Sequence, residues 1–494
     1  NRELTYARNE AAERNRFLSQ SMNTVPLPTF EESRNLLPQP VWDGQESVID
    51  CYWYAWKIAF SNLRNPREGS GFVSPFNGFL FMWDSAFITM FGRYGFHAFD
   101  FQQTLDNFYA SQHKDGFICR ELCESEPGGH FARHDPSSTG PQILTWSEWE
   151  HYSVTADRDR LKKVFDPLLA YHQWMRLTRT WRDGTYWSSG WGCGMDNQPR
   201  LQEGYDVCFS HGHQVWADAC LQAILDAKLL IRMAECLGRT EAIDGLKQEA
   251  EHLTEQVNSM LWSDEDAFYY DLWRDGTQNR VKSVGAYWAL LADVVPDGKR
   301  KAFLSHLENP TEFFTTHPIP SLSADHPQYD PNGGYWLGGV WSPTNYMVLK
   351  GLEKHGEAAL AHRIASRHLQ AVTEVYRNTG TLWENYSPEY PKQGTPAKDQ
   401  FVGWTGLAPI SVLFEYVFGI HSDPVNKKIR WDVNCTERHG ILNYPFGNGC
   451  VDLLCEKRTN CAEPLQISVK TNVPFTLELH WNGNIKAVKY GIDC

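Results

Sequence analysis

The sequence predicts a large helical barrel followed by a small β-sandwich. Up to about residue 418, apolar residues recur at spacings of three and four, which is typical of amphipathic helices. From about residue 421, short alternating or β-branched runs are separated by Gly, Asn and Pro, as in strands joined by turns. The sequence lacks the regular strand and helix alternation of a parallel α/β fold. We therefore expect a helical or extended segment over residues 1–45, a barrel domain over 46–420 and a β domain over 421–494.

The helical patterns are spread along most of the chain. A polar stretch over residues 5–20 and a Pro-containing connection over residues 26–40 come first. Amphipathic helices are then expected over residues 47–63, 158–178, 213–237, 241–261, 343–354 and 357–377. The loops between them are rich in Gly, Pro, Trp and Tyr, and long loops on a rigid scaffold are where functional sites tend to be built.

The last part of the chain predicts strands and carries many cysteines. Strands are expected over residues 428–432, 451–455, 465–471 and 475–481. Five of the twelve cysteines, at positions 435, 450, 455, 461 and 494, lie in this part, where a small core would gain most from cross-links. This clustering favours an oxidising compartment, so we expect a periplasmic or secreted protein, with a cytoplasmic one as the alternative.

Composition narrows the class of partner. The net charge of −14 disfavours nucleic acid, which is bound mainly by Lys and Arg. The sequence contains no run of 18 apolar residues, so no membrane span is expected. Twenty Trp, 21 Tyr and 26 Phe supply flat rings of the kind that stack on the apolar faces of sugars. A carbohydrate partner fits these features, although a large aromatic core would give the same composition.

Four aromatic clusters stand out, and three of them carry an acidic residue. They span residues 81–87 with Asp84, 190–200 with Asp196, 334–341, and 382–388 with Glu384. Partial burial of a carboxyl group raises its pKa and prepares it to donate a proton near neutral pH. Glycosidic cleavage needs one such acid and a second carboxylate that attacks carbon or activates water. Taken singly, each acidic residue could instead cap a helix, order a loop or pair with a base.

In these motifs the sequence resembles the trehalase-like clan of glycoside hydrolases, and most closely glycoside hydrolase family 63 with its mannosylglycerate hydrolase-like branch. The matching phrases lie, in the family's order, at residues 83–87, 112–117, 139–146, 194–200, 261–271, 335–346, 384–388 and 401–405. The resemblance implies an (α/α)6 barrel, or six-hairpin toroid, with the small C-terminal β-sandwich domain behind it.

The resemblance also implies the chemistry. It suggests an inverting, exo-acting hydrolase of terminal α-linked glucose or mannose, with Asp196 as general acid and Glu384 as general base, their carboxyl groups about 6.5–9.5 Å apart. No cofactor and no metal are implied. The residues expected to contact substrate are Trp83, Asp84, Gln142, Trp146, Tyr335, Trp336, Trp341, Tyr386 and Trp404.

Two positions depart from the family pattern. The acid motif usually opens with Glu-Ser-Gly, but here it reads Gly192-Cys193-Gly194. The usual Tyr-Trp-Arg-Gly-Pro phrase has Leu337 in place of the arginine. A glycerate carboxylate would be poorly bound without that arginine, so mannosylglycerate is not the expected substrate.

Two other classes of function compete with hydrolysis. A sugar epimerase or a polysaccharide lyase on the same barrel would use His or Tyr for proton transfer, which would place His211, His213 or Tyr386 at the centre of the pocket. A carbohydrate-binding protein that has lost activity would keep the aromatic rings and could tolerate the altered motif positions. The pair His211 and His213 is not expected to bind a metal, because no third ligand accompanies it.

Overall fold

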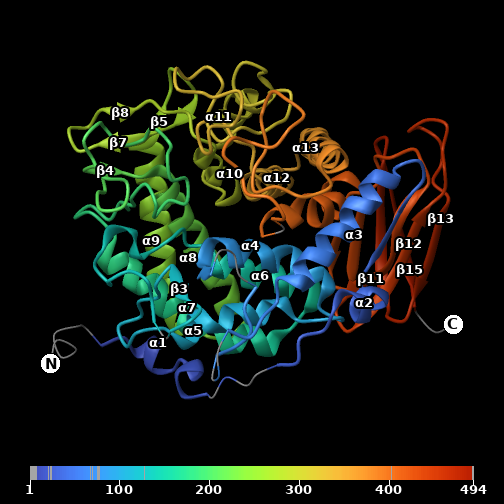
Figure 1. Cartoon of the computed structure of the whole chain (residues 1–494), viewed down its shortest axis with the longest axis horizontal. Coiled ribbons are helices and arrows are strands. Elements are labelled where there is room, and N and C mark those ends of the chain that lie inside the picture. Colours follow the sequence, from blue (N-terminus) through green and yellow to red (C-terminus); the bar gives the residue numbers. More distant parts are fainter. Residues whose placement is uncertain are drawn as a thin grey trace.

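The computed structural model describes residues 8–20, 22, 25–66, 68, 70–74, 78–126, 128–401 and 403–491. Its helical part and its β part lie side by side, with the β sheets at one end of the molecule (Figure 1). Residue 5, where the first helical stretch was expected to begin, and Cys494 lie outside the described residues. Within those residues, no helix is long and apolar enough to cross a membrane.

Six inner segments pack against one another in a closed ring, which confirms the helical barrel. In ring order they are α4 (Met82–Gly92), α6 (Leu144–Thr155), α8 (Ala217–Leu237), α10 (Trp288–Leu291), α12 (Ser342–Lys354) and the π-helical η12 (Ala408–Val417). Outer helices cover the ring (Figure 1): α3 (Glu46–Ser61), α7 (Arg158–Thr178), α9 (Ile243–Gln256) and α13 (Ala358–Thr379). The remaining short helices are α1 (Glu10–Glu13), α2 (Phe30–Ser33), α5 (Asp106–Ala110) and α11 (Asp297–Ser305).

Local sequence explains where several helices begin and end. The Asp157 side chain accepts a hydrogen bond from the Arg160 amide and caps α7, whose bounds match the expected residues 158–178. Gly238 and Gly380 end α8 and α13 in the left-handed conformation, at φ 72° and 73°. In the described part of the helical stretch expected over residues 5–20, α1 is followed by a separate 3-10 turn, Arg16–Ser19, which begins where the Asn15 side chain accepts a hydrogen bond from the Phe17 amide.

The β part is a sandwich of two four-stranded sheets, as the sequence predicted. One sheet has the order β1 (Gln39–Trp42), β11 (His439–Phe446), β12 (Gly449–Cys455) and β13 (Ile467–Thr471). The other has the order β15 (Asn484–Tyr490), β14 (Phe475–Trp481), β10 (Lys428–Asp432) and β9 (Ile420–Asp423), with β10 and β14 parallel. Phe446 and Phe475 pack between the sheets with ring centroids 5.7 Å apart.

The N-terminal segment contributes strand β1 to this sandwich. Gln39 pairs with Leu442 and Trp42 pairs with His439, in antiparallel register. The cysteines at 435, 450, 455 and 461 have free thiols, so the cross-links considered from the sequence are not formed between these four described residues.

Small sheets of two or three strands lie in the loops of the barrel. They are β2 (Phe79–Phe81) with β3 (Glu121–Cys123), β4 (Gln214–Val215) with β7 (Asp271–Trp273) and β8 (Gln278–Asn279), and β5 (Trp262–Ser263) with β6 (Phe268–Tyr269). The first of these pairs places Arg120 beside the start of α4, where the Met82 amide donates to the Arg120 carbonyl at 2.7 Å.

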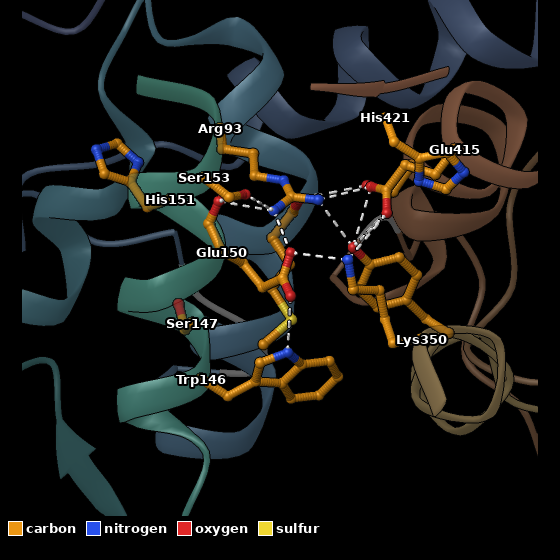
Figure 2. A network of polar contacts seen from close by, with 12 residues as sticks. Arg93, Trp146, Ser147, Glu150, His151, Ser153, Lys350, Glu415 and His421 are labelled. Atoms are coloured by element: carbon orange, nitrogen blue, oxygen red, sulfur yellow. Dashed lines mark hydrogen bonds and ion pairs between the residues drawn. The ribbon is translucent and has the colours of Figure 1, made fainter. Parts of the chain in front are cut away.

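A buried charge network fills the ring where the inner helices end (Figure 2). Arg93 follows the last turn of α4 and bonds to Glu150 on α6 and, at 2.6 Å, to Glu415 on η12. Lys350 on α12 lies 3.2 Å from Glu150 and 3.6 Å from Glu415. Cations placed at helix C-termini are stabilised by the helix dipoles. The network thus joins α4, α6, α12 and η12 at one end of the ring.

Candidate active site

The predicted site residues gather at the other end of these helices, where the inner helices begin. Trp83 and Asp84 lie in the first turn of α4, and Trp341 is the N-cap residue of α12. Trp404 is the N-cap residue of the short 3-10 turn Thr405–Leu407. The loops that carry Asp196 and Glu384 join this end. Helix N-termini carry partial positive charge, which favours a cluster of acidic groups here.

The loop that carries Asp196 is held at both sides. Gly194 adopts φ +77°, and a Cβ built there would lie 3.4 Å from the Trp83 ring, so the loop packs closely over the indole. At its end, the buried Arg200 guanidinium bonds to Asp218 and Asp271 at 2.6–2.8 Å. These contacts fix the direction of the loop, and Asp196 itself remains partly exposed.

Glu384 is buried and held by hydrogen bonds from three directions. The Lys398 amide donates to its Oε2 at 3.2 Å, and its own amide donates to the Lys398 carbonyl at 2.9 Å. The Trp404 indole N–H donates to the Glu384 carbonyl at 2.8 Å. The Tyr335 hydroxyl donates to Glu384 Oε1 at 3.3 Å. Donors to the carboxylate favour its ionised form.

Asn197 ties the two carboxylate loops together. Its Nδ2 donates to the Gly334 carbonyl at 2.9 Å, and its Oδ1 accepts from the Trp336 amide at 2.9 Å. Between those two positions lies Tyr335, in the left-handed conformation at φ 66° and bonded to Glu384. This conformation is sterically uncommon for residues other than Gly. The residue next to Asp196 therefore reaches, through one tyrosine, the carboxylate of Glu384.

The acidic groups of this cluster act on one another's pKa values. Burial raises the pKa of Asp196 from 3.8 to about 6, and the charge of Arg120 partly offsets this rise. Burial also raises the pKa of Asp84 well above its ordinary value, and the carboxylates of Glu384 and Asp196 raise it further. Burial raises the pKa of Glu384 too, while its bonds from Lys398 and Tyr335 oppose the shift. The three carboxyl groups thus influence one another's charge, but each has different hydrogen-bond partners.

Several buried polar atoms around α4 lack a hydrogen-bond partner among the described residues. They include Trp83 Nε1, Asp84 Oδ1 and Gln142 Oε1. Gly194 lies close to both Trp83 and Pro141, the residue before Gln142, so these atoms belong to one neighbourhood. A buried polar group without a partner is costly, and such groups are satisfied when a ligand supplies hydroxyls.

The aromatic residues of the third cluster pack behind Tyr335. The Trp336 and Trp341 rings stack with centroids 3.9 Å apart and planes 4° apart, and both are buried. Trp341 Nε1 donates to the Tyr335 carbonyl at 3.3 Å, and the Trp341 ring lies 5.5 Å from that of Trp404. In the structure these indoles support the tyrosine and the Glu384 loop.

Two further predicted contact residues lie deeper. Trp146 is 2% exposed, and its indole N–H donates to Glu150 in the charge network at 3.0 Å (Figure 2). Tyr386 is fully buried, and its hydroxyl accepts a hydrogen bond from the Trp383 amide at 3.2 Å. Both residues are engaged by the protein, Trp146 within the ring and Tyr386 within the Glu384 loop.

Arg120 and Asn197 were not singled out from the sequence. Arg120 directly precedes β3 and comes near α4 only because β3 pairs with the distant β2, so its approach to Asp84 has no local signal. Asn197 follows Asp196 directly, and an Asn in a Gly-rich loop commonly bonds to nearby backbone. That preference was the available signal.

The histidines of the competing proton-transfer hypothesis are engaged in contacts of their own. The His211 ring lies between Trp181 and Trp187, at 4.9 and 5.1 Å, and its Nδ1 accepts from the His213 amide at 3.0 Å. With Tyr386 also buried and bonded, none of these three groups is bonded to the carboxyl cluster in the described structure.

Comparisons with known proteins show what this chain is similar to. Residues 78–405 match the family described as mannosylglycerate hydrolase MGH1-like glycoside hydrolase domain. The mannosylglycerate hydrolase of Thermus thermophilus is 26% identical over 374 residues, covering 61% of this chain and 88% of that protein. A probable mannosyl-oligosaccharide glucosidase of Schizosaccharomyces pombe is 25% identical over 288 residues, covering 50% of this chain. The match covers 34% of the yeast protein, so this chain spans about a third of its length.

A solved structure gives the same result for the fold. The crystal structure of a GH63 mannosylglycerate hydrolase from Thermus thermophilus in complex with glucose superposes with a TM-score of 0.59 at 22% identity. The superposition covers 72% of this chain and 98% of that one. The two chains share the barrel fold.

Proposed function

This chain belongs to the mannosylglycerate hydrolase MGH1-like family of glycoside hydrolases, and on that premise we propose that it removes a terminal α-linked glucose or mannose with inversion at the anomeric carbon. Asp196 is the general acid in this proposal, and Glu384 is the general base. Relatives are named as a mannosylglycerate hydrolase and a mannosyl-oligosaccharide glucosidase, which is why both sugars are considered.

The observation that carries the proposal is the different surroundings of two neighbouring carboxyl groups. Burial is the main influence on the pKa of Asp196 and raises it to about 6, so the carboxyl group can keep a proton for the glycosidic oxygen. Glu384 receives hydrogen bonds from the Lys398 amide and the Tyr335 hydroxyl, and both favour its ionised form. An ionised carboxylate can accept a proton from water as that water attacks the sugar. Acid and base are thus assigned by environment.

The sugar ring would bind between these groups and the start of α4. Trp83 Nε1 can donate to a hydroxyl, while Asp84 Oδ1 and Gln142 Oε1 can accept from hydroxyls. Because these atoms are buried and lack partners among the described residues, a sugar that satisfies them gains more than one that does not. The Trp83 indole offers an apolar surface beside them.

The remaining predicted residues act by support in this proposal. Tyr335 positions Glu384 through its hydroxyl, and Trp336 and Trp341 hold Tyr335 in place. Trp404 fixes the backbone of Glu384. Small displacements of a reacting group cost large factors in rate, so loss of this support should lower kcat more than it raises KM.

The test is a hydrolysis screen on α-glucosides and α-mannosides, with NMR detection of the first-formed anomer. We expect the β-anomer first from the wild type, and losses of several orders of magnitude in Asp196→Asn and Glu384→Gln. Release of the α-anomer would refute inversion. Activity that survives both substitutions would favour the epimerase or lyase alternative, and inactivity of the wild type on every donor would favour a binding protein.

A further inference from the structure

A row of aromatic side chains lies beside the acid loop, with Trp191 and His130 exposed and Phe131 and Phe79 half-buried. Trp191, five residues before Asp196, is 38% exposed, which is unusual for so large an apolar side chain. Its ring lies 6.4 Å from that of Phe131 at 71°. The row continues from Phe131 to His130 at 5.0 Å and from His130 to Phe79 at 5.2 Å. Scattered exposed rings are normal, but a row of rings in contact with one another marks a surface for binding.

This row is connected to the general acid. The Gly194 amide donates to the Trp191 carbonyl at 3.1 Å, within the loop that presents Asp196. The Arg120 guanidinium lies 4.9 Å above the centre of the Phe131 ring. The charge of Arg120 also acts on both Asp196 and Asp84. Contacts therefore connect the acid loop to Trp191 and, beside Arg120, to Phe131.

The position of the general acid indicates which part of the substrate lies beside Trp191. A general acid protonates the oxygen of the bond that breaks, so it stands on the side of the leaving group. Residues packed against the acid loop are therefore placed to contact the leaving group. Flat exposed rings stack on the apolar faces of sugar rings.

The charge around this surface argues against an anionic leaving group. Arg120 is already engaged, since its Nε donates to the Ser137 carbonyl at 2.7 Å and its Nη2 lies 3.5 Å from Glu121. Glu121 adds a fourth acidic group to the cluster of Asp84, Asp196 and Glu384. A carboxylate on the leaving group would be repelled by these acidic groups, and the charge of Arg120 is already balanced by Glu121.

We infer that Trp191 and Phe131 form a leaving-group subsite that stacks a second, uncharged sugar ring, so that the substrate is an oligosaccharide and not a glycoside of glycerate. This inference rests on the proposed function, because it takes Asp196 as the acid. It adds the class of leaving group, which the catalytic pair alone does not specify.

The test compares donors with and without a sugar leaving group. α-D-Glucosyl and α-D-mannosyl fluoride supply the reacting sugar but no ring for Trp191, whereas α-linked glucose and mannose disaccharides supply both. In Trp191→Ala we expect kcat/KM for the disaccharide to fall about tenfold or more, with the fluoride unchanged. Trp191→Tyr should restore most of the loss, Phe131→Ala should show a smaller loss, and the remote, exposed Leu177→Ala should change neither donor.

Each other outcome overturns a defined claim. Equal losses on fluoride and disaccharide in Trp191→Ala would assign the ring to loop structure and refute the subsite, as would no loss on either. A wild type that prefers α-mannosylglycerate to every disaccharide would refute the uncharged leaving group. A wild type inactive on fluorides and disaccharides alike would refute the proposed function itself, and this inference with it.

Discussion

Replacement of the proposed general acid by its amide should stabilise the protein at neutral pH. Burial raises the pKa of Asp196 from 3.8 to about 6 in the folded state. A carboxyl group with a raised pKa contributes stability that is complete below its unfolded pKa and is lost as pH rises through its folded pKa. The amide of Asp196→Asn does not ionise. The variant should therefore gain stability relative to the wild type between about pH 4 and 6, and keep that gain above pH 6.

The size of this gain follows from the shift. A rise from 3.8 to about 6 corresponds to about 3 kcal/mol of free energy of unfolding. Because Asp196 is partly exposed, solvent screening reduces this value, and we expect about 1–3 kcal/mol. The same substitution should abolish hydrolysis. Stability and activity are thus expected to change in opposite directions.

Urea unfolding at pH 4.0 and pH 7.5 measures this prediction. The free energy of unfolding of the variant is compared with that of the wild type at each pH. The difference at pH 7.5 minus the difference at pH 4.0 is the predicted gain. Asp50→Asn, at an exposed position in α3, is the matched control and should show no such dependence on pH. The reasoning fails if Asp196→Asn has the same relative stability at both pH values, or is less stable than the wild type at pH 7.5.

Three further predictions concern the neighbours of the catalytic pair and the charge network. In the wild type, kcat/KM should fall about tenfold per pH unit above pH 6. In Arg120→Met this fall should begin at higher pH, because the charge of Arg120 lowers the pKa of Asp196. A pH–rate profile that is the same in variant and wild type would contradict this prediction. Tyr335→Phe should lower kcat and move the acidic limb of the same profile to higher pH. The Tyr335 hydroxyl lowers the pKa of Glu384, so its removal should raise that pKa. A change in KM alone would count against this role. Glu415→Gln should lower the free energy of unfolding in urea by about 3 kcal/mol and leave kcat/KM within about twofold, and a large loss of activity in the folded protein would be the opposing result.

The amphipathic helices, among them the inner helices α8 and α12, and four strands of the β part could be predicted from the sequence, whereas the inner helices α4 and α6 could not. Helix α7 has one apolar face, and its bounds follow from that stripe. In α4 every residue is buried, and α6 is nearly as enclosed, so neither has a polar face to reveal its period. Strand β1 was missed because its partner lies in the last part of the chain.

The candidate site was predictable as a set of loops, but not in the role of each side chain. Asp84, Asp196 and Glu384 stood out by their aromatic, Gly-rich surroundings, and the structure brings them together. Trp146 and Trp404 were expected from the family resemblance, yet their indoles bond to the protein itself. An aromatic residue in a loop has the same signature whether it faces a ligand or supports a neighbour, and only its partners distinguish the two roles.

The pairing of β1 with β11 has a consequence for synthesis on the ribosome. Gln39 and Leu442 are about four hundred residues apart, so β1 leaves the ribosome about 20–80 s before its partner at ordinary elongation rates. During that interval the barrel segments are made while one edge of the future sandwich has no neighbour. Loss of β1 should leave β11 as an exposed edge of its sheet, whereas loss of β15 near the C-terminus should affect the other sheet.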